Sequence, residues 1–376
     1  MRSTPKVRAL RGLAGALLVA AGGLALACGP GEEKESAQGE GAAPSGESKP
    51  PAAPAPDVAA LRVKAKGIFG VLPADAPNPA NPITPEKVTL GRMLFYEPRI
   101  TLSRKLSCNS CHGLDTYGVD NQPTSVGHEG QRGERNSPTV YNAALEFVQF
   151  WDGRAADVEE QAKGPVLNPV EMAMPSEPEV VGRLKEIPGY GPLFAAAFPG
   201  EADPINFDNA AKAIAAFERK LVTPGPFDDF LNGNDQALTP EQLAGLQTFM
   251  DTGCITCHNG ATVGGRMFQK LGLVEPYPTK DVGREKVTHN EADRYFFKVP
   301  MLRNVAKTGP WFHDGSIQNL DDAIRLMARH QLGKQLGTGE IASIRAFLES
   351  LTGRVDAAFV AKPELLPDAN APAPSA

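Results

Sequence analysis

Cysteine is scarce in this sequence, with five among 376 residues, so a small fold held together by disulfide bonds is excluded. Basic residues are not in excess, because 38 lysines and arginines stand against 44 aspartates and glutamates, giving a formal net charge of −6. A strongly basic nucleic-acid-binding protein is therefore not expected. The 38 glycines follow no three-residue period, which excludes collagen. A chain of this length suggests two or three domains.

The N-terminal 57 residues are not typical of a folded domain. Residues 2–11 carry four basic side chains, and residues 13–27 form an uncharged run that is too short to cross a membrane as a helix. This pattern predicts that residues 1–27 are an export signal peptide. Residues 28–57 contain almost no large apolar side chains and are rich in Gly, Pro, Ala, Ser and Glu, so they are predicted to form a flexible tether.

The residues just before position 28 allow two interpretations of how the signal peptide is removed. A small residue directly before Cys28 resembles a bacterial lipobox, in which that cysteine becomes the lipidated first residue. Ala25 and Ala27 also fit an ordinary signal-peptidase site. A tether has an obvious use after a lipid anchor, so the lipoprotein interpretation is favoured. Both interpretations predict a periplasmic protein.

The remaining four cysteines belong to two copies of one motif. Residues 108–112 and 254–258 both have the pattern C-x-x-C-H, the attachment sequence of c-type haem. Two thiols three residues apart reach both vinyl groups of one porphyrin, and the adjacent histidine lies under the iron as its proximal ligand. A zinc site would normally recruit further cysteines or histidines at short spacing, which neither motif has. The sequence therefore predicts two covalently bound haem c groups, attached through Cys108, Cys111, Cys254 and Cys257, with His112 and His258 as iron ligands.

Apolar residues recur at helical spacing along the chain, and no run alternates as a strand would. The predicted helices cover 88–96, 209–221, 239–250, 320–329 and 339–351. One of them leads into each haem motif, which indicates a duplicated cytochrome c unit. The fold class is therefore mainly α, with two cytochrome c-like domains that each hold one covalent haem. Residues 58–222 are predicted as the N-terminal haem domain and residues 223–354 as the C-terminal haem domain.

The second protein ligand of each haem iron decides the chemistry. An iron with two protein ligands carries electrons, whereas an iron with an openable face can bind peroxide. His128 follows the first motif in a glycine-rich loop, where a displaceable ligand is expected. The residues alone do not choose the ligand of the second haem, for which the candidates are Met301, Met327, His313 and His330. Of these, His330 is expected at the surface.

Several stretches of the chain are similar to the bacterial di-haem cytochrome c peroxidases, over about residues 70–360. The resemblance is carried by residues 149–155, 160–162, 164–165, 168–172, 297–305 and 311–316. It implies that the haem on His112 is the low-potential, peroxidatic haem and that His128 is its displaceable distal ligand. It also implies that Gln161 and Glu171 form the distal-pocket pair.

The same resemblance assigns the second haem. The haem on His258 is implied to be the high-potential site where electrons enter, with Met327 as its second ligand and Trp151 between the two haems. Met301 occupies a position where the family usually has a small polar residue. It is interpreted as packing, since methionine fills irregular gaps. If Met301 is the ligand instead, the assignment of the second haem is wrong.

Family resemblance also implies features outside the haems. One calcium ion is expected between the domains, bound by the Asn136 side chain and the carbonyls of Thr308 and Pro310. Calcium prefers oxygen ligands, and waters must complete so small a set. Residues 355–376 are expected to pack back onto the N-terminal domain, and a homodimer is expected.

The chemistry of peroxide cleavage supports these roles independently. A proton must move from one peroxide oxygen to the other as the O–O bond breaks, and a carboxylate such as Glu171 can act as general base and then acid. An amide such as Gln161 can orient peroxide without adding charge. The predicted enzyme is a cytochrome c peroxidase that reduces hydrogen peroxide to two waters with electrons from a small cytochrome c or cupredoxin.

Two alternative functions remain. A MauG-like di-haem oxidase would modify a partner protein and would use a tyrosine as the second ligand of the second haem, but residues 320–329 contain no tyrosine. A non-catalytic electron-transfer protein would keep both irons permanently six-coordinate and would not turn over peroxide.

Overall fold

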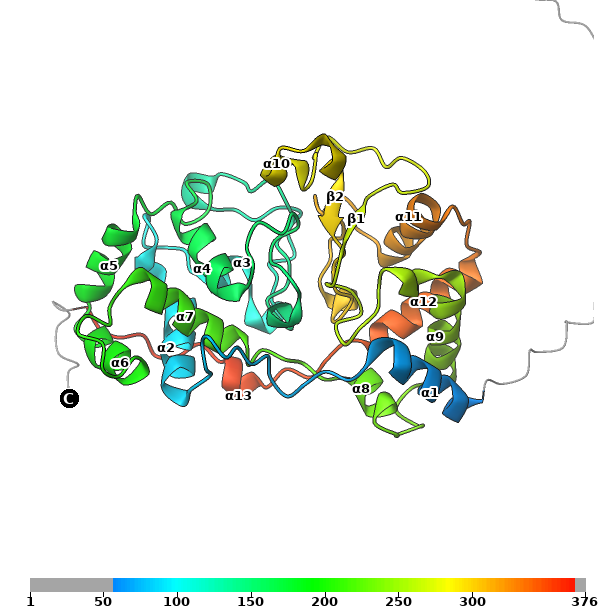
Figure 1. Cartoon of the computed structure of the whole chain (residues 1–376), viewed down its shortest axis with the longest axis horizontal. Coiled ribbons are helices and arrows are strands. Elements are labelled where there is room, and N and C mark those ends of the chain that lie inside the picture. The colour runs from blue at the N-terminus through cyan, green and yellow to red at the C-terminus, as the bar shows by residue number, and fades with distance from the viewer. Residues whose placement is uncertain (1–56, 369–376) are drawn as a thin grey trace, which may run out of the picture. The chain divides into compact units, whose positions relative to one another are not determined.

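The structure is a computed structural model that describes residues 57–368. The described residues are mainly helical, as the sequence predicted (Figure 1). Their α-helices are α1 (Val58–Phe69), α2 (Pro85–Phe95), α3 (Cys108–Cys111), α4 (Val158–Leu167), α5 (Glu177–Lys185), α6 (Tyr190–Ala197), α7 (Phe207–Glu218), α8 (Pro226–Leu231), α9 (Pro240–Thr252), α10 (Glu285–Thr288), α11 (Leu320–Leu332), α12 (Thr338–Ser350) and α13 (Ala357–Val360). Two short strands, β1 (Phe268–Lys270) and β2 (Phe296–Lys298), pair antiparallel.

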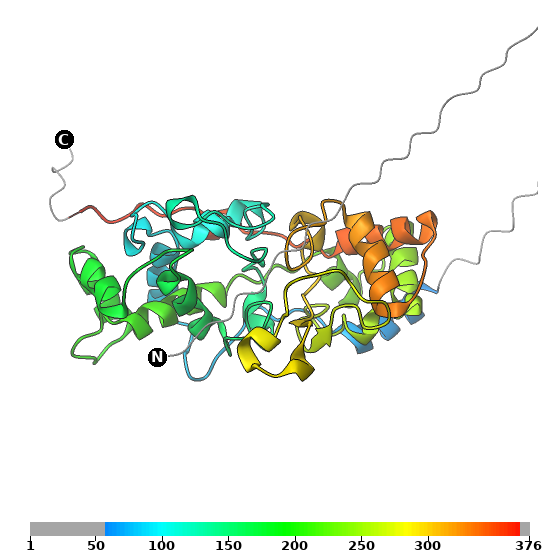
Figure 2. The same cartoon turned by 90° about the horizontal axis from the view of Figure 1, so that it is seen from above.

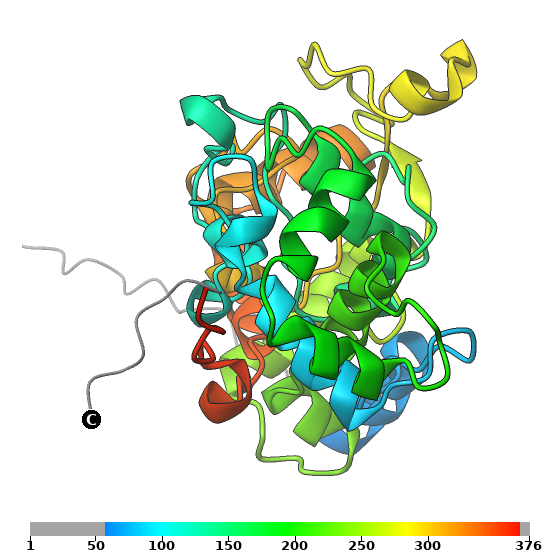
Figure 3. The same cartoon turned by 90° about the vertical axis from the view of Figure 1, so that its left-hand side faces the viewer.

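The predicted signal peptide, Cys28 and nearly all of the tether lie outside the described residues. Within residues 57–368, no helix has the length and apolar character needed to cross a membrane. The segment that contains α10 projects away from the helices around it (Figure 3).

The helices that lead into the two haem motifs begin in the same way. Thr84 caps α2 by accepting a hydrogen bond from a backbone N–H of the first turn, and Pro85 occupies the first helical position. Thr239 and Pro240 do the same for α9. A threonine cap satisfies a donor that has no helical partner, and proline fits where no N–H is needed. The predicted cap at Thr239 is confirmed, whereas α2 begins at Pro85, three residues before the predicted start at 88, because Thr84 supplies the same cap.

The buried apolar residues form two clusters. The first core is built by α2 and α4–α7, and the second core by α1, α8, α9 and α12. Each is centred on one close helix pair, α2 with α7 and α9 with α12. A Cβ atom at Gly91 would lie 1.9 Å from the Ala213 carbonyl oxygen, and one at Gly245 would lie 1.9 Å from the Ser343 carbonyl oxygen. Only glycine permits so close an approach, and overpacking of this kind typically costs about 1–3 kcal/mol.

The two ends of the described chain cross between the cores. Helix α1 places Leu61, Ala65 and Phe69 on one face, and Phe69 packs edge-on against Phe227 of the second core, with ring centroids 5.4 Å apart. The chain end after α12 runs back to the helices of the first core (Figure 2). There the Tyr96 hydroxyl donates to the Val360 carbonyl at 2.6 Å. The predicted N-terminal domain, residues 58–222, groups α1 with the first haem motif because the two are close in the chain. In the structure, α1 packs in the second core instead.

A structural repeat relates two segments that are 162 residues apart. Asn142 and Asn304 both adopt left-handed backbone conformations, with φ of 62° and 63°, and each starts a short 3-10 helix. Phe150 and Phe312 follow in equivalent places, with φ of 65° and 68°. A β-bridge closes each turn, between residues 149 and 155 in the first segment and between 311 and 317 in the second. The N-cap residues of α4 and α11 are also 162 positions apart. A residue in the first segment is therefore matched by the residue 162 positions later.

Candidate functional site

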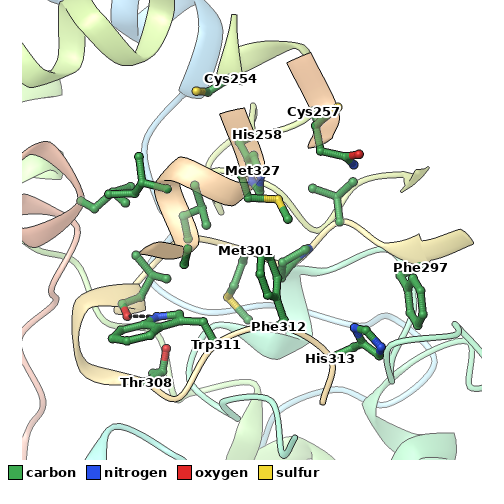
Figure 4. A pocket seen from close by; sticks show the side chains of 18 of the residues that line it. Cys254, Cys257, His258, Phe297, Met301, Thr308, Trp311, Phe312, His313 and Met327 are labelled. Carbon is green, nitrogen blue, oxygen red and sulfur yellow. Dashed lines mark hydrogen bonds between the residues drawn. The ribbon is translucent and has the colours of Figure 1, made fainter. Parts of the chain in front are cut away.

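The second C-x-x-C-H motif opens into a largely apolar cavity (Figure 4). Cys254, Cys257 and His258 line it together with side chains from α9, α11 and α12. Burial raises the pKa of the Cys254 thiol to about 11. Burial also lowers the pKa of the His258 imidazole to about 4, so the ring is neutral and able to coordinate a metal. An apolar cavity with two adjacent thiols and a neutral imidazole fits the group that the motif predicts.

Two methionines reach the same cavity from different elements. Met327 projects into it from α11, and Met301 projects from the segment after β2 (Figure 4). The repeat shows that the two methionines have different surroundings. Met301 matches Thr139 of the first segment, and Thr139 directly follows Pro138. The carbonyls of Pro138 and Pro300 face the imidazoles of His112 and His258 respectively. Met301 therefore follows a residue that contacts His258, whereas Met327 comes from a separate helix.

The first C-x-x-C-H motif has the same proximal arrangement. The Nδ1 atom of His112 lies 3.3 Å from the Gly118 carbonyl oxygen, and that of His258 lies 3.4 Å from the Val263 carbonyl oxygen. Burial lowers the pKa of His112 and raises the pKa of the Cys108 thiol to about 12. Carbonyls of this kind fix the tautomer of an iron-ligating histidine and orient its ring.

The repeat gives the two motifs different distal helices. Helix α4 matches α11, and Pro165 stands where α11 carries Met327. Proline has no side-chain donor atom for iron, so α4 offers no ligand at this position. Gln161 lies four residues before Pro165, which places both residues on one face of α4.

His128 is held beside the Glu171 segment through its main chain. Its N–H donates to the carbonyls of Val170 at 3.0 Å and Glu171 at 2.9 Å. Its Nδ1 atom is buried and has no hydrogen-bond partner within residues 57–368. A buried imidazole nitrogen normally has a hydrogen-bond partner. The His128 ring therefore fits a role other than hydrogen bonding.

Glu171 is a half-buried carboxyl that a neighbouring amide holds in place. The Asn168 Nδ2 group donates to its Oε1 atom at 2.9 Å. Burial raises the Glu171 pKa, and the opposing effects of Arg154 and Asn168 do not reverse the shift. A carboxyl with a raised pKa exchanges protons more readily near neutral pH, which suits a group that both takes and returns a proton.

Trp151 connects the first segment of the repeat to the cavity of the second motif. Its indole Nε1 donates to the Asn136 carbonyl at 2.9 Å, and the Asn136 N–H donates to the His313 carbonyl at 2.8 Å. The rings of Trp151 and His313, which match each other in the repeat, meet edge to face with centroids 6.5 Å apart. Trp151 also lines the cavity of the second motif.

The other histidine candidates have partners of their own. His313 is 2 % exposed, lies 3.0 Å from the Thr279 hydroxyl through Nε2 and packs on Phe297. His330 is 5 % exposed, and its Nδ1 atom lies 2.9 Å from the Glu275 carbonyl oxygen. The expectation that His330 lies at the surface is wrong, because the segment around Glu275 covers it.

The residues predicted to bind calcium all line one cavity. Asn136, Thr308 and Pro310 all line the cavity of the second motif. The Asn136 Nδ2 group donates to the Gln122 carbonyl at 3.0 Å, which leaves its Oδ1 atom as the possible ligand. Amide and carbonyl oxygens are suitable for calcium. No group of three or more His, Cys, Asp or Glu side chains within residues 57–368 is arranged to hold a metal ion.

Sequence reasoning missed a buried ion pair beside Trp151. The ammonium of Lys298 pairs with the Glu146 carboxylate, and both side chains are 4 % exposed. The Lys298 N–H donates to the Trp151 carbonyl at 2.7 Å. The two charges are 152 residues apart in the chain, so no local pattern could have paired them.

Comparison with known proteins identifies the family. A family model described as di-haem cytochrome c peroxidase matches residues 85–236. The chain is 47 % identical to cytochrome c551 peroxidase of Pseudomonas aeruginosa over 311 residues, which cover 81 % of this chain and 89 % of that protein. The chain belongs to the di-haem cytochrome c peroxidase family.

Other members of this peroxidase family are also similar. The cytochrome c551 peroxidase of Nitrosomonas europaea is 46 % identical, over 76 % of this chain and 86 % of that protein. The methylamine utilization protein MauG of Methylophilus methylotrophus is 34 % identical, over 75 % and 87 %. Among solved structures, a MauG-like protein associated with microbial copper homeostasis superposes with a TM-score of 0.68 at 27 % identity, over 78 % of this chain and 95 % of that one.

Proposed function

We propose that this protein is a periplasmic di-haem cytochrome c peroxidase that reduces hydrogen peroxide to two waters with electrons from a small cytochrome c or cupredoxin. Its identity of 46–47 % to two cytochrome c551 peroxidases supports this function. One observation in the structure carries it: the His128 N–H donates to the backbone carbonyl of Glu171, whose carboxyl has a raised pKa, and Pro165 stands on α4 where α11 has Met327.

The proposed roles of the chain's own residues follow from this geometry. The two haems, when bound, would supply the peroxide-binding iron and a store for the second electron. Glu171 takes a proton from one peroxide oxygen and returns it to the other as the bond breaks. Asn168 orients the Glu171 carboxyl through its hydrogen bond of 2.9 Å, and Gln161 positions peroxide from the same face of α4 as Pro165. A base and an orienting amide in fixed places lower the entropy cost of the proton transfer.

His112 and His258 are proposed as the proximal iron ligands and Met327 as the second ligand of the C-terminal haem. The different surroundings of the two methionines support this choice, since Met301 directly follows Pro300, whose carbonyl faces His258. A thioether ligand raises the haem potential relative to two imidazoles, so this haem suits electron entry. Trp151, which lines the same cavity, is proposed to link the two haems.

His128 is proposed to bind the N-terminal iron in the fully oxidised protein and to leave it when the C-terminal haem is reduced. The buried Nδ1 atom without a hydrogen-bond partner in the described chain supports a ligand role for this side chain. The test is an EPR spectrum of the half-reduced protein. Release of His128 converts the N-terminal iron to high spin, whereas a persistent low-spin signal contradicts gating.

The proposal also includes a calcium ion, the division into domains, a homodimer and a lipid anchor. Asn136, Thr308 and Pro310 would bind one calcium ion, and removal of calcium by a chelator is expected to lower turnover. Of the predicted N-terminal haem domain, residues 58–222, helix α1 packs in the second core, so residues 70–222 would form the first haem domain and residues 223–354 with α1 the second. The tail would lie against the first domain, and the protein would form a homodimer. A lipid anchor at Cys28 would tether the protein to a membrane, which mass spectrometry of the purified N-terminus tests.

The alternatives make different predictions. Helix α11 carries Met327 and no tyrosine, which disfavours a MauG-like oxidase. A steady-state assay with reduced cytochrome c and hydrogen peroxide decides between the classes. Peroxide-dependent oxidation of the cytochrome supports the peroxidase. Turnover only with a protein substrate supports the oxidase, and no turnover with any donor supports a simple electron carrier.

A further inference from the structure

Glu218, the last residue of α7, is a buried carboxyl with no role in the mechanism above. Its side chain is 4 % exposed, and within residues 57–368 it forms no hydrogen bond or ion pair. The adjacent Arg219 is occupied by Glu159, to which it donates at 2.9 and 2.6 Å, and by the Ala76 carbonyl at 3.0 Å. The Glu218 carboxyl is therefore buried beside an ion pair that is already complete.

The helix pairs of the two cores show what Glu218 faces. Phe217 of α7 packs on Gly91, and Phe347 of α12 packs on Gly245 in the same way. Carbonyl oxygens just after the two helices also correspond: Leu221 accepts from the Asn142 N–H at 2.8 Å, and Leu351 accepts from the Asn304 N–H at 3.1 Å. Each α12 residue lies 130 positions after its α7 counterpart, so Glu218 corresponds to Leu348.

Leu348 lines the cavity of the second C-x-x-C-H motif. By this correspondence, Glu218 faces the first motif from the same direction. The charge of Glu218 acts on Cys108, where it adds to burial in raising the thiol pKa. The chain thus has a carboxyl beside the first haem-attachment site at the position where the second site has an apolar side chain.

A buried carboxyl without a counterion is sensitive to any new charge nearby. Burial and, to a smaller extent, the charge of Glu159 on α4 raise the Glu218 pKa to about 8, against the opposing effect of Arg219. The charge of Glu218 also acts on the Cys108 thiol of α3, which haem attachment would convert to a thioether. An electron added to the adjacent haem makes the carboxylate less favourable, and protonation relieves the repulsion.

We propose that Glu218 takes up one proton when the N-terminal haem gains one electron. The electron goes to the haem iron, and the proton passes from solvent to the carboxylate, which becomes a neutral carboxylic acid. Oxidation of the haem returns the proton. The proposal rests on the proposed attachment of haem to Cys108 and Cys111 and not on peroxide turnover.

Spectroelectrochemical titration of the holoprotein tests the proposal, from about pH 6 to about pH 9, a range that brackets the Glu218 pKa. In the wild type, the midpoint potential of the N-terminal haem should fall by up to about 59 mV for each tenfold drop in proton concentration, the limit for one proton per electron. Glu218→Gln keeps the shape of the side chain but removes its ionisable group. Glu218→Leu introduces the residue found at the corresponding position, 348, of α12. Both should make the potential independent of pH over this range.

The controls separate this proposal from other sources of pH dependence. Glu186→Gln, at an exposed carboxyl, should retain the wild-type slope. A wild-type potential that does not change with pH, or a slope that survives Glu218→Gln, overturns the proposal. Infrared difference spectra between the reduced and oxidised wild type do not depend on whether a variant folds. A band of a protonated carboxyl group should appear when the haem is reduced, and its absence also overturns the proposal. A chain without haem at Cys108 and Cys111 would show in the pyridine haemochrome spectrum and would contradict the proposed function itself.

Discussion

The backbone N–H of Lys298 donates to the carbonyl of Trp151 at 2.7 Å, so strand β2 holds the chain directly at the tryptophan. The Lys298 side chain meanwhile forms the buried ion pair with Glu146. One residue therefore joins the backbone of the Trp151 segment to a buried carboxylate that has no other ion-pair partner within residues 57–368.

Lys298→Met should destabilise the protein by about 3–5 kcal/mol, because it leaves the Glu146 carboxylate buried without its cation. Denaturant unfolding of the holoprotein measures the loss. The double variant with Glu146→Gln should recover a large part of it, since both charges are then gone. Lys280→Met, at an exposed lysine, should change stability by less than about 0.5 kcal/mol. A small effect of the Lys298 variant would show that Glu146 reaches water.

Glu171→Gln should lower the turnover number with peroxide by about 10²–10⁴-fold, the usual contribution of a positioned acid–base group. Haem content and both haem spectra should stay unchanged. Glu129→Gln is the matched control, because Glu129 lies on the neighbouring loop with its side chain 78 % exposed. Unchanged turnover in the Glu171 variant would remove this carboxyl from the mechanism.

Met327→His should lower the potential of the C-terminal haem, because two imidazoles favour the oxidised iron more than an imidazole and a thioether do. Met301→Thr copies Thr139 of the first segment and should leave the potential and the ligand spectrum of that haem nearly unchanged. The reverse pattern, with the spectrum altered only by the Met301 variant, would transfer the ligand assignment to Met301.

Pro165→Met should place a thioether beside the N-terminal haem, because Pro165 occupies the position on α4 that Met327 occupies on α11. We expect a low-spin iron that persists after half-reduction and a loss of peroxide turnover. Pro165→Ala removes the proline without adding a ligand, and it should keep turnover. A fully active Pro165→Met variant would mean that the two helices do not present equivalent faces.

The stability of the holoprotein should fall as pH rises from the ordinary carboxyl range toward about 8. An unfolded chain releases the Glu218 proton at an ordinary pKa, while the raised pKa keeps that proton on the folded protein up to about 8. The folded state then binds more protons, and the free energy of unfolding decreases with pH. Thermal melts of Glu218→Gln should show a smaller decrease than the wild type, whereas Glu186→Gln, at an exposed carboxyl, should match the wild type.

Local sequence chemistry accounts for the helices well. The predicted helix 320–329 is confirmed as α11, since Asn319 caps its start and Gly333 ends it in a left-handed conformation. Helix α1 is different: its face of Leu61, Ala65 and Phe69 is apolar enough for either core, and only the tertiary structure selects the second. Distance along the chain was a poor guide to that choice.

The environment of the site depends on contacts between distant parts of the chain. The pairing of Glu146 with Lys298 joins residues whose local sequences contain no sign of each other. His330 looked like a solvent-facing residue because its helix is amphipathic, and the loop that covers it carries no strong pattern. The motif cysteines and histidines could be recognised because haem attachment needs a fixed local spacing.

The crossing of the chain ends has a consequence for how the protein is made. Helix α1 leaves the ribosome before any part of the second core to which it contributes, and Val360 completes the first core only when synthesis is almost finished. Neither core is one continuous piece of chain, so neither half can be expected to mature as an excised fragment. Folding of the N-terminal domain first, which is usual for multidomain chains, is therefore not open to this protein, because each core needs segments from both ends of the chain.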